Sequence, residues 1–209
     1  MNRSVFIVID GLDGSGKTTV IEHLKKVFAG REDVVFTREP GGTPEAEELR
    51  EFFLRTRAQP LQKATEILLV EAARAEHLAR VVAPALEAGK LVICDRFDAA
   101  TYVYNVSEDD SYLQELFVLI NNRIVAHLSP HRYIFLDVPP EVSVERSRKR
   151  GDETRFDKAS LSDYIERRER YHEFFTEYVL SDVDIVDATQ SIESVCAEVL
   201  ACITAQCGE

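Results

Sequence analysis

A glycine-rich stretch near the start of the chain has the spacing that binds the phosphates of a nucleoside triphosphate. The segment GLDGSGKTT, residues 11–19, contains G-x-x-x-x-G-K-[ST] between an apolar run and a helical pattern. Such glycines let backbone N–H groups and a helix N-terminus converge on phosphates, while the lysine reaches the β- and γ-phosphates and the hydroxyl binds Mg²⁺. We expect a nucleotide site made of Gly11, Leu12, Asp13, Gly14, Ser15, Gly16, Lys17, Thr18 and Thr19.

Asp13 places a negative charge inside this anion-binding loop. A carboxylate aimed at a triphosphate would be repelled, so we expect it to point away from the phosphates. A charge kept beside phosphates needs a compensating partner. The alternative is that Asp13 stabilises the turn by accepting a bond from its own backbone.

Three further charged residues follow predicted strands. Asp95 ends the apolar run LVICD, Arg96 comes directly after it, and Arg38 lies in TREPGGT. In open α/β folds the carboxyl ends of strands form the ligand site, where a carboxylate can hold Mg²⁺ and guanidinium groups bind phosphate oxygens in pairs. Alone, each could be an ordinary turn or surface residue. Together they predict a metal ligand, Asp95, and a second phosphate site for a phosphorylated acceptor.

The segment ERSRKRGDETRFDK, residues 145–158, is rich in arginine and nearly free of apolar residues. We expect it to be a mobile lid that adds positive charge over the γ-phosphate and excludes water. Its catalytic candidates are Arg148, Arg150 and Arg155, beside Lys17 and Asp95. The alternative is a solubilising charged loop.

Short apolar runs that alternate with helical patterns must position these residues. The runs lie at 5–9, 34–37, 91–94, 133–138 and 183–188, and the longest helical pattern spans 61–87. This alternation predicts an α/β fold with a parallel sheet and helices on both faces. A length of 209 residues suits one domain, residues 1–209.

Composition narrows the class of protein. A net charge of −12, from 37 acidic and 25 basic residues, disfavours a nucleic-acid interface or an acidic membrane surface. No apolar run approaches the roughly 20 residues of a membrane span, and the four cysteines form no CxxC pair. No NKxD-type guanine-reading segment occurs, which favours ATP over GTP. We expect a cytoplasmic enzyme that acts on small molecules.

The motifs resemble, in their order and across nearly the whole chain, those of thymidylate kinases of the bacterial type: GLDGSGKTT, TREPGGT, LLVEAARAEH, LVICDRF, RSRKRGDETRFD and VDATQSIESV. The resemblance implies a P-loop kinase fold with a five-stranded parallel sheet, a small mobile lid and a homodimer. It implies transfer of the γ-phosphoryl group of ATP to dTMP with Mg²⁺, which gives dTDP and ADP. It also implies that the lid carries the catalytic arginine.

The resemblance assigns roles in the acceptor site as well. Asp13 would accept a hydrogen bond from the acceptor's 3′-hydroxyl, Arg74 would bind a thymine carbonyl, Thr101 would face the base, and Tyr104 would disfavour a ribose 2′-hydroxyl. The expected acceptor-binding residues are Asp13, Arg38, Val70, Arg74, Arg96, Thr101, Tyr104 and Asn105.

Departures from the family pattern gather around the base. Val70 stands where the family usually has an aromatic residue that stacks on the base. If nothing replaces that residue, the loss of stacking costs roughly 1 to 3 kcal/mol of binding free energy. Ala100 replaces a usual serine, and NVSEDDS follows Tyr104 in place of a glutamine-glycine sequence. The alternatives are therefore a kinase for another pyrimidine deoxynucleotide or for a deoxynucleoside, and an ATP-binding module without catalysis.

Overall fold

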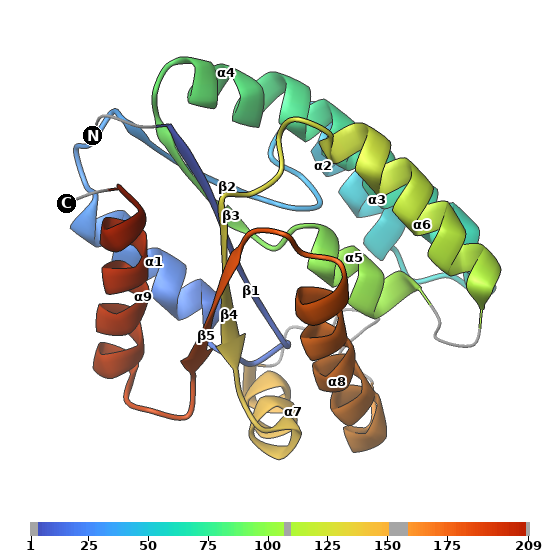
Figure 1. Ribbon diagram of the computed structural model, residues 1–209. Helices are drawn as coiled ribbons and strands as arrows, with labels where there is room; N and C mark the ends of the chain where they lie inside the picture. Colours follow the sequence, from blue (N-terminus) through green and yellow to red (C-terminus); the bar gives the residue numbers. More distant parts are fainter. Residues whose placement is uncertain (1–3, 107–109, 151–158, 208–209) are drawn as a thin grey trace.

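A parallel sheet of five strands forms the centre of the molecule (Figure 1). The computed structural model describes residues 4–106, 110–150 and 159–207. The strand order is β2-β3-β1-β4-β5, and every neighbouring pair is parallel. The strands are β1 (Val5–Gly11), β2 (Val34–Arg38), β3 (Leu91–Asp95), β4 (Arg132–Asp137) and β5 (Asp182–Asp187). The predicted α/β fold and its five strands are confirmed.

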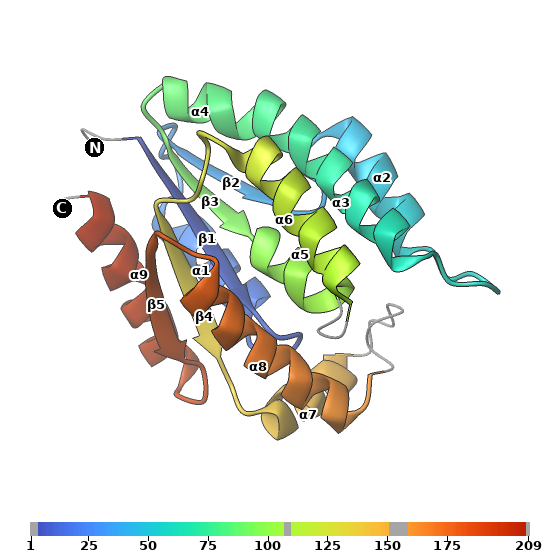
Figure 2. The same ribbon diagram turned by 45° about the vertical axis from the view of Figure 1, so that its right-hand side comes forward.

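Helices cover both faces of this sheet (Figures 1 and 2). Alternate side chains of a strand point to opposite faces, so Ile7 and Ile9 pack against α1 and α9, while Phe6 and Val8 pack on the other face. The helices are α1 (Lys17–Val27), α2 (Pro44–Leu54), α3 (Lys63–His77), α4 (Ala83–Glu87), α5 (Asp98–Asn105), α6 (Ser111–Val125), α7 (Pro140–Arg150), α8 (Leu161–Glu177) and α9 (Ile192–Cys207). Because both faces are covered, β1 is buried along its whole length.

The long helical pattern predicted for residues 61–87 is a continuous helical segment with one irregular turn. Helix α3 passes into a π-helical turn, η1 (Leu78–Val82), and then into α4. Pro84 lacks the backbone N–H that would continue the regular α pattern at this point. The apolar periodicity therefore predicted the helix but not the change in its winding.

The described part of the predicted lid is helical. Residues 145–150 complete α7, where Glu145 and Lys149 form an i,i+4 ion pair and Ser147 is buried. The movement of this segment as a lid stays a prediction. Residues 151–158 lie outside the described part of the chain. None of the helices in the described part combines the length and apolar composition that a bilayer crossing demands.

Candidate active site

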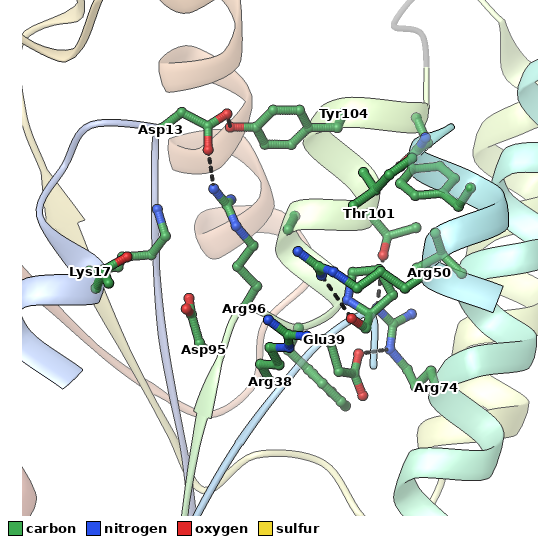
Figure 3. Close-up of a pocket in the computed structure, with 18 of the residues that line it drawn as sticks. Asp13, Lys17, Arg38, Glu39, Arg50, Arg74, Asp95, Arg96, Thr101 and Tyr104 are labelled. Carbon is green, nitrogen blue, oxygen red and sulfur yellow. Dashed lines mark hydrogen bonds and ion pairs between the residues drawn. The ribbon is translucent and has the colours of Figure 1, made fainter. Parts of the chain in front are cut away.

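A pocket of about 590 Å³ opens at the carboxyl ends of β1, β2 and β3 (Figure 3). This volume suits a small-molecule ligand. The pocket brings together residues from the glycine-rich loop, the ends of β2 and β3, and helices α2, α3 and α5. The predicted site residues that line it are Asp13, Gly14, Gly16, Lys17, Thr18, Thr19, Arg38, Val70, Arg74, Asp95, Arg96, Thr101, Tyr104 and Asn105.

The glycine-rich loop curls at the start of α1 as its spacing predicts. Gly16 has a φ of 99°, in the left-handed region, and Lys17 is the first helical residue. A Cβ atom on Gly14 would lie 2.4 Å from the carbonyl oxygen of Ser143 in α7, so only glycine fits there. Leu12 is fully buried and anchors the loop in the core, while the side chains of Thr18 and Thr19 are exposed to the pocket.

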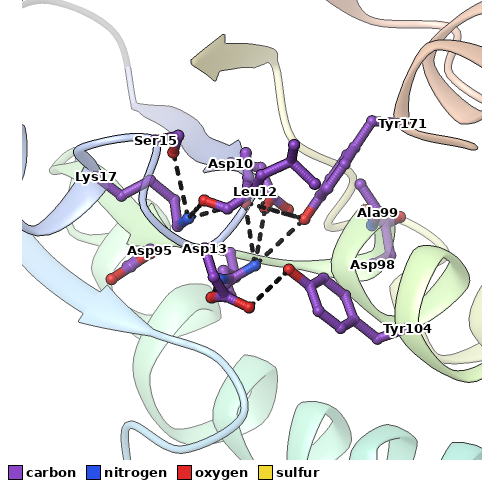
Figure 4. A network of polar contacts seen from close by, with 12 residues as sticks. Asp10, Leu12, Asp13, Ser15, Lys17, Asp95, Asp98, Ala99, Tyr104 and Tyr171 are labelled. Atoms are coloured by element: carbon purple, nitrogen blue, oxygen red, sulfur yellow. Dashed lines mark hydrogen bonds and ion pairs between the residues drawn. The ribbon is translucent and has the colours of Figure 1, made fainter. Parts of the chain in front are cut away.

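Lys17 is held inside this loop by backbone carbonyls (Figure 4). Its ammonium group donates to the carbonyl oxygens of Gly11 and Leu12, each at 2.8 Å. Burial and the nearby guanidinium of Arg96 lower the pKa of Lys17 to about 8, although Asp13 and Asp95 oppose this shift. The lysine is therefore a cation whose charge is sensitive to its immediate surroundings.

The carboxylate of Asp13 turns away from Lys17 and toward α5. It accepts a hydrogen bond from Arg96 Nη2 at 2.5 Å and another from the hydroxyl of Tyr104 at 2.9 Å. Burial alone would raise the pKa of Asp13, but Arg96 and Lys17 hold it below its usual value. Within the described residues, the carboxylate thus bonds to other elements and not to the backbone of its own turn.

Arg96 ties the end of β3 to the loop. Its backbone has a φ of 64°, which a non-glycine residue adopts only under constraint from its surroundings. Its Nη1 donates to Gly11 O and to the Tyr171 hydroxyl, both at 3.2 Å. With the bond to Asp13, three of the five guanidinium N–H groups have partners in the described chain, and two remain for a ligand.

Two more arginines line the pocket opposite the loop. Arg38 ends β2 in register with Asp95 and pairs with Glu47 of α2 at 2.7 Å, with about half of its side chain exposed. Arg50 of α2, which was not predicted, donates to the carbonyl oxygen of Pro40 at 2.8 Å. Burial and the charge of Arg38 lower the pKa of Arg50, as expected where cations crowd together. Its only sequence signal is its i,i+3 spacing from Glu47.

Arg74 is fully buried in the wall where the base is expected. It donates from Nε to Glu39 Oε2 and from Nη2 to Thr101 Oγ1, both at 2.8 Å. Its Nη1 contacts Glu71 and Asn121, and Glu39 also contacts His77 Nδ1 at 2.8 Å. Sequence reasoning missed this network because its members come from four separate segments. Their contacts fix Arg74 and Thr101 relative to each other.

The wall around Val70 is apolar. Val70 is 4% exposed and lines the pocket together with Phe53 and Phe97, which are 5% and 1% exposed. The aromatic side chains at this wall thus come from α2 and from the end of β3. Asn105 also lines the pocket, and its amide donates to Glu66 Oε2 at 3.0 Å.

Asp95 and Thr18 fit the requirements of a magnesium site. Both line the pocket, and the buried Oδ1 of Asp95 has no hydrogen-bond partner among the described residues. The described chain contains no cluster of three histidine, cysteine, aspartate or glutamate side chains able to hold a metal. Mg²⁺ at nucleotide sites needs none, because one or two protein oxygens, phosphates and water complete its shell.

The predicted lid arginines are only partly described. Arg148 is exposed and does not line the pocket. Arg146, two residues earlier in α7, does line it and donates to the carbonyl oxygen of Ala188 at 3.0 Å. The Arg150 side chain and Arg155 lie outside the described residues. Arg146 is thus the basic residue of this segment that the described structure brings to the pocket.

Comparisons with known proteins identify the family of the chain. The thymidylate kinase family model matches residues 9–199. Thymidylate kinase of Hahella chejuensis is 37% identical over 206 residues, which cover 95% of this chain and 95% of that protein. Thymidylate kinase of Symbiobacterium thermophilum is 42% identical over 202 residues, which cover 92% of this chain and 89% of that protein. A crystal structure of thymidylate kinase from Ehrlichia chaffeensis matches with a TM-score of 0.71 and 26% identity over 96% of this chain and 99% of that one. The chain belongs to the thymidylate kinase family.

Proposed function

We propose that the protein transfers the γ-phosphoryl group of ATP to dTMP, which gives dTDP and ADP. The observation that carries the proposal is one pocket lined by the P-loop lysine, Lys17, with Arg96 beside the loop, and by Arg38 and Arg50 opposite the loop. Two opposed cationic walls suit a phosphoryl donor and an acceptor that is itself phosphorylated. The family membership of the chain supports the same reaction.

Catalysis of this transfer rests on positioning and charge neutralisation. The loop backbone holds the donor phosphates, and Lys17 neutralises charge on the β- and γ-phosphates. Thr18 and Asp95 would hold Mg²⁺, which supplies further positive charge to the phosphate oxygens when bound. Arg38, Arg50 and Arg96 orient the acceptor phosphate, and Arg146 adds positive charge from α7. The predicted lid arginines Arg148, Arg150 and Arg155 would add further positive charge over the γ-phosphate.

The other wall of the pocket selects the acceptor nucleoside. Arg74 and Thr101 present polar groups to the base, Asp13 accepts from the 3′-hydroxyl, and Tyr104 narrows the space beside the sugar. The fixed contact of Arg74 with Thr101 supports a base-reading role, because a preorganised polar pair loses little entropy on binding. Val70, Phe53 and Phe97 supply the apolar surface for the ring.

A panel of acceptors tests the proposal. ADP release from ATP and Mg²⁺ is measured with dTMP, dUMP, dCMP and thymidine, each against a blank without acceptor. We expect dTMP to have the highest kcat/KM and thymidine to be inactive, because the three arginines need an acceptor phosphate. Turnover of thymidine with none of dTMP would refute the roles of Arg38 and Arg96.

We also propose a homodimer that forms through the helical layer of α2, α3 and α6. Leu68 of α3 and Leu119 of α6 are large apolar side chains that are 49% and 62% exposed, and a second copy of the chain would cover them. Sedimentation equilibrium of the wild type and of Leu119→Glu tests this surface. We expect a dimer for the wild type and a monomer for the variant.

The cytoplasmic location stays a prediction.

A further inference from the structure

Helix α8 reaches the acceptor side of the pocket through a residue that no sequence motif singled out. The helix packs beside α5, where Arg170 donates to the carbonyl oxygens of Val103 and Tyr102 at 3.1 and 2.9 Å (Figure 2). Arg167 lies three residues earlier and hence on the same face of α8. Arg170 holds the end of α5, which leaves the role of Arg167 to be explained.

The guanidinium of Arg167 lies over an aromatic ring of the pocket. Its Cζ atom is 4.7 Å from the centre of the Tyr104 ring and 5.5 Å from that of Tyr164. Its Nη1 atom is buried and has no hydrogen-bond partner among the described residues. A buried cationic nitrogen without such a partner is costly, and the negative face of an aromatic ring is the group that compensates it here. Arg167 is therefore bound to Tyr104 by its charge and its planar shape.

Tyr104 in turn is bound to Asp13. The Tyr104 hydroxyl donates to Asp13 Oδ2 at 2.9 Å, and Arg96 lies 5.4 Å from the same ring while it donates to Asp13 Oδ1. A shift of the ring would lengthen the bond to Asp13, because hydrogen bonds weaken steeply with distance and angle. The position of Asp13 therefore depends on what holds Tyr104.

We propose that Arg167 is a positioning residue for the acceptor, which fixes Tyr104 against Asp13 and so shapes the sugar side of the pocket. The proposal rests on the proposed function, because the acceptor is taken to be a deoxynucleoside monophosphate. Arg167 does not line the pocket, so it acts through Tyr104 and not by contact with the nucleotide.

The test compares Arg167→Met with the wild type in steady-state kinetics and in calorimetric titration of dTMP. Loss of a largely desolvated cation–π contact should raise the KM and the Kd of dTMP by about 3- to 10-fold, with kcat and the KM of ATP within about twofold. Arg167→Lys keeps the charge and should recover part of the loss. Arg80→Met is the matched control, because Arg80 is an exposed arginine of η1 that pairs with Glu76 and does not line the pocket.

A double-mutant cycle with Tyr104→Phe separates this role from a general effect on stability. The phenylalanine keeps the ring but removes the hydroxyl that reaches Asp13, so Arg167→Met should have less than about half of its effect on the Kd of dTMP in that background. Equal effects in both backgrounds would overturn the proposal, and so would a larger rise in the KM of ATP than of dTMP. If the wild type turns over dTMP and Arg167→Met binds it normally, this inference alone fails. If the wild type does not turn over dTMP, the proposed function fails as well.

Discussion

Asp13→Asn is the substitution whose effect follows most directly from the geometry. The change keeps the size of the side chain and removes its negative charge. In the structure each carboxylate oxygen accepts one hydrogen bond, Oδ1 from Arg96 and Oδ2 from Tyr104. The amide has a single oxygen, so one of these two donors loses its acceptor and meets an N–H group instead.

The magnitude follows from the hydrogen bonds at stake. A hydrogen bond to a charged group contributes about 1.5 to 3 kcal/mol. The side chains of Asp13 and Arg96 are only 16% and 19% exposed, so solvent does little to replace the lost contact. If the carboxylate also accepts the 3′-hydroxyl of dTMP, the KM of dTMP rises by about 10- to 100-fold. The KM of ATP does not rise, because removal of a negative charge beside the triphosphate reduces repulsion.

The assay measures the KM of each substrate by coupled ADP release at saturating concentrations of the other. Asp33→Asn is the matched control, since Asp33 also accepts two bonds from an arginine, Arg31, but lies before β2 at the opposite end of the sheet. Urea unfolding of each variant shows whether the native fold is present during the assay. A folded Asp13→Asn protein with an unchanged KM for dTMP would refute the sugar-binding role. An equal rise in both KM values would place Asp13 on the donor side.

Three further predictions concern the donor, the metal and the base. The pKa of Lys17 is lowered to about 8, so its ammonium group loses its charge as the pH rises through that value. We therefore expect kcat/KM for ATP to fall above about pH 8. The fall in kcat should occur at higher pH, because the phosphates of bound ATP stabilise the charged lysine. A fall that sets in only near pH 10 would contradict this. Asp95→Asn should raise the Mg²⁺ concentration for half-maximal rate by at least about tenfold, measured by Mg²⁺ titration at fixed ATP; an unchanged titration would exclude Asp95 as a ligand. Phe53→Leu should raise the KM of dTMP by about fivefold through loss of aromatic surface from the pocket that Val70 also lines, whereas an unchanged dTMP KM would leave Phe53 as core packing alone.

The residues that sequence reasoning placed correctly are those fixed by the backbone. Short apolar runs identified all five strands. The central strands β1, β3 and β4 are largely buried and have nearly continuous apolar sequence, whereas the edge strands β2 and β5 are only partly buried. Strand ends then placed Asp95, Arg96 and Arg38 at one edge, and the register of Arg38 with Asp95 confirms that β2 and β3 bring them together. The glycine spacing likewise predicted the curled loop before α1, in which Gly16 has a left-handed backbone.

The residues that it missed depend on contacts between side chains from distant segments. Tyr171 lies 161 and 160 residues after Asp10 and Gly11, which it contacts, and no local pattern carries that information. Arg50 resembles any helix-surface arginine until α2 packs beside the end of β2. Arg167 likewise has the appearance of a solvated helix charge until α8 lies against α5.

The departure at Val70 shows a different limit. The sequence shows that an aromatic residue is missing from one position, but not whether another side chain occupies the same space. In the structure Phe53 and Phe97 line the same pocket as Val70. The effect of such a substitution on the apolar contact with the base therefore depends on tertiary packing, because neighbouring side chains fill space that a smaller residue leaves.

Transfer of the phosphoryl group itself is the most direct test of the central claim. The wild-type protein is incubated with ATP labelled in its γ-phosphate, Mg²⁺ and dTMP, and the labelled products are separated. We expect the label to move to the β-phosphate of dTDP, with little released as inorganic phosphate. Label that appears only as inorganic phosphate, or that stays in ATP with dTMP while another monophosphate accepts it, would refute the transfer of the γ-phosphoryl group to dTMP.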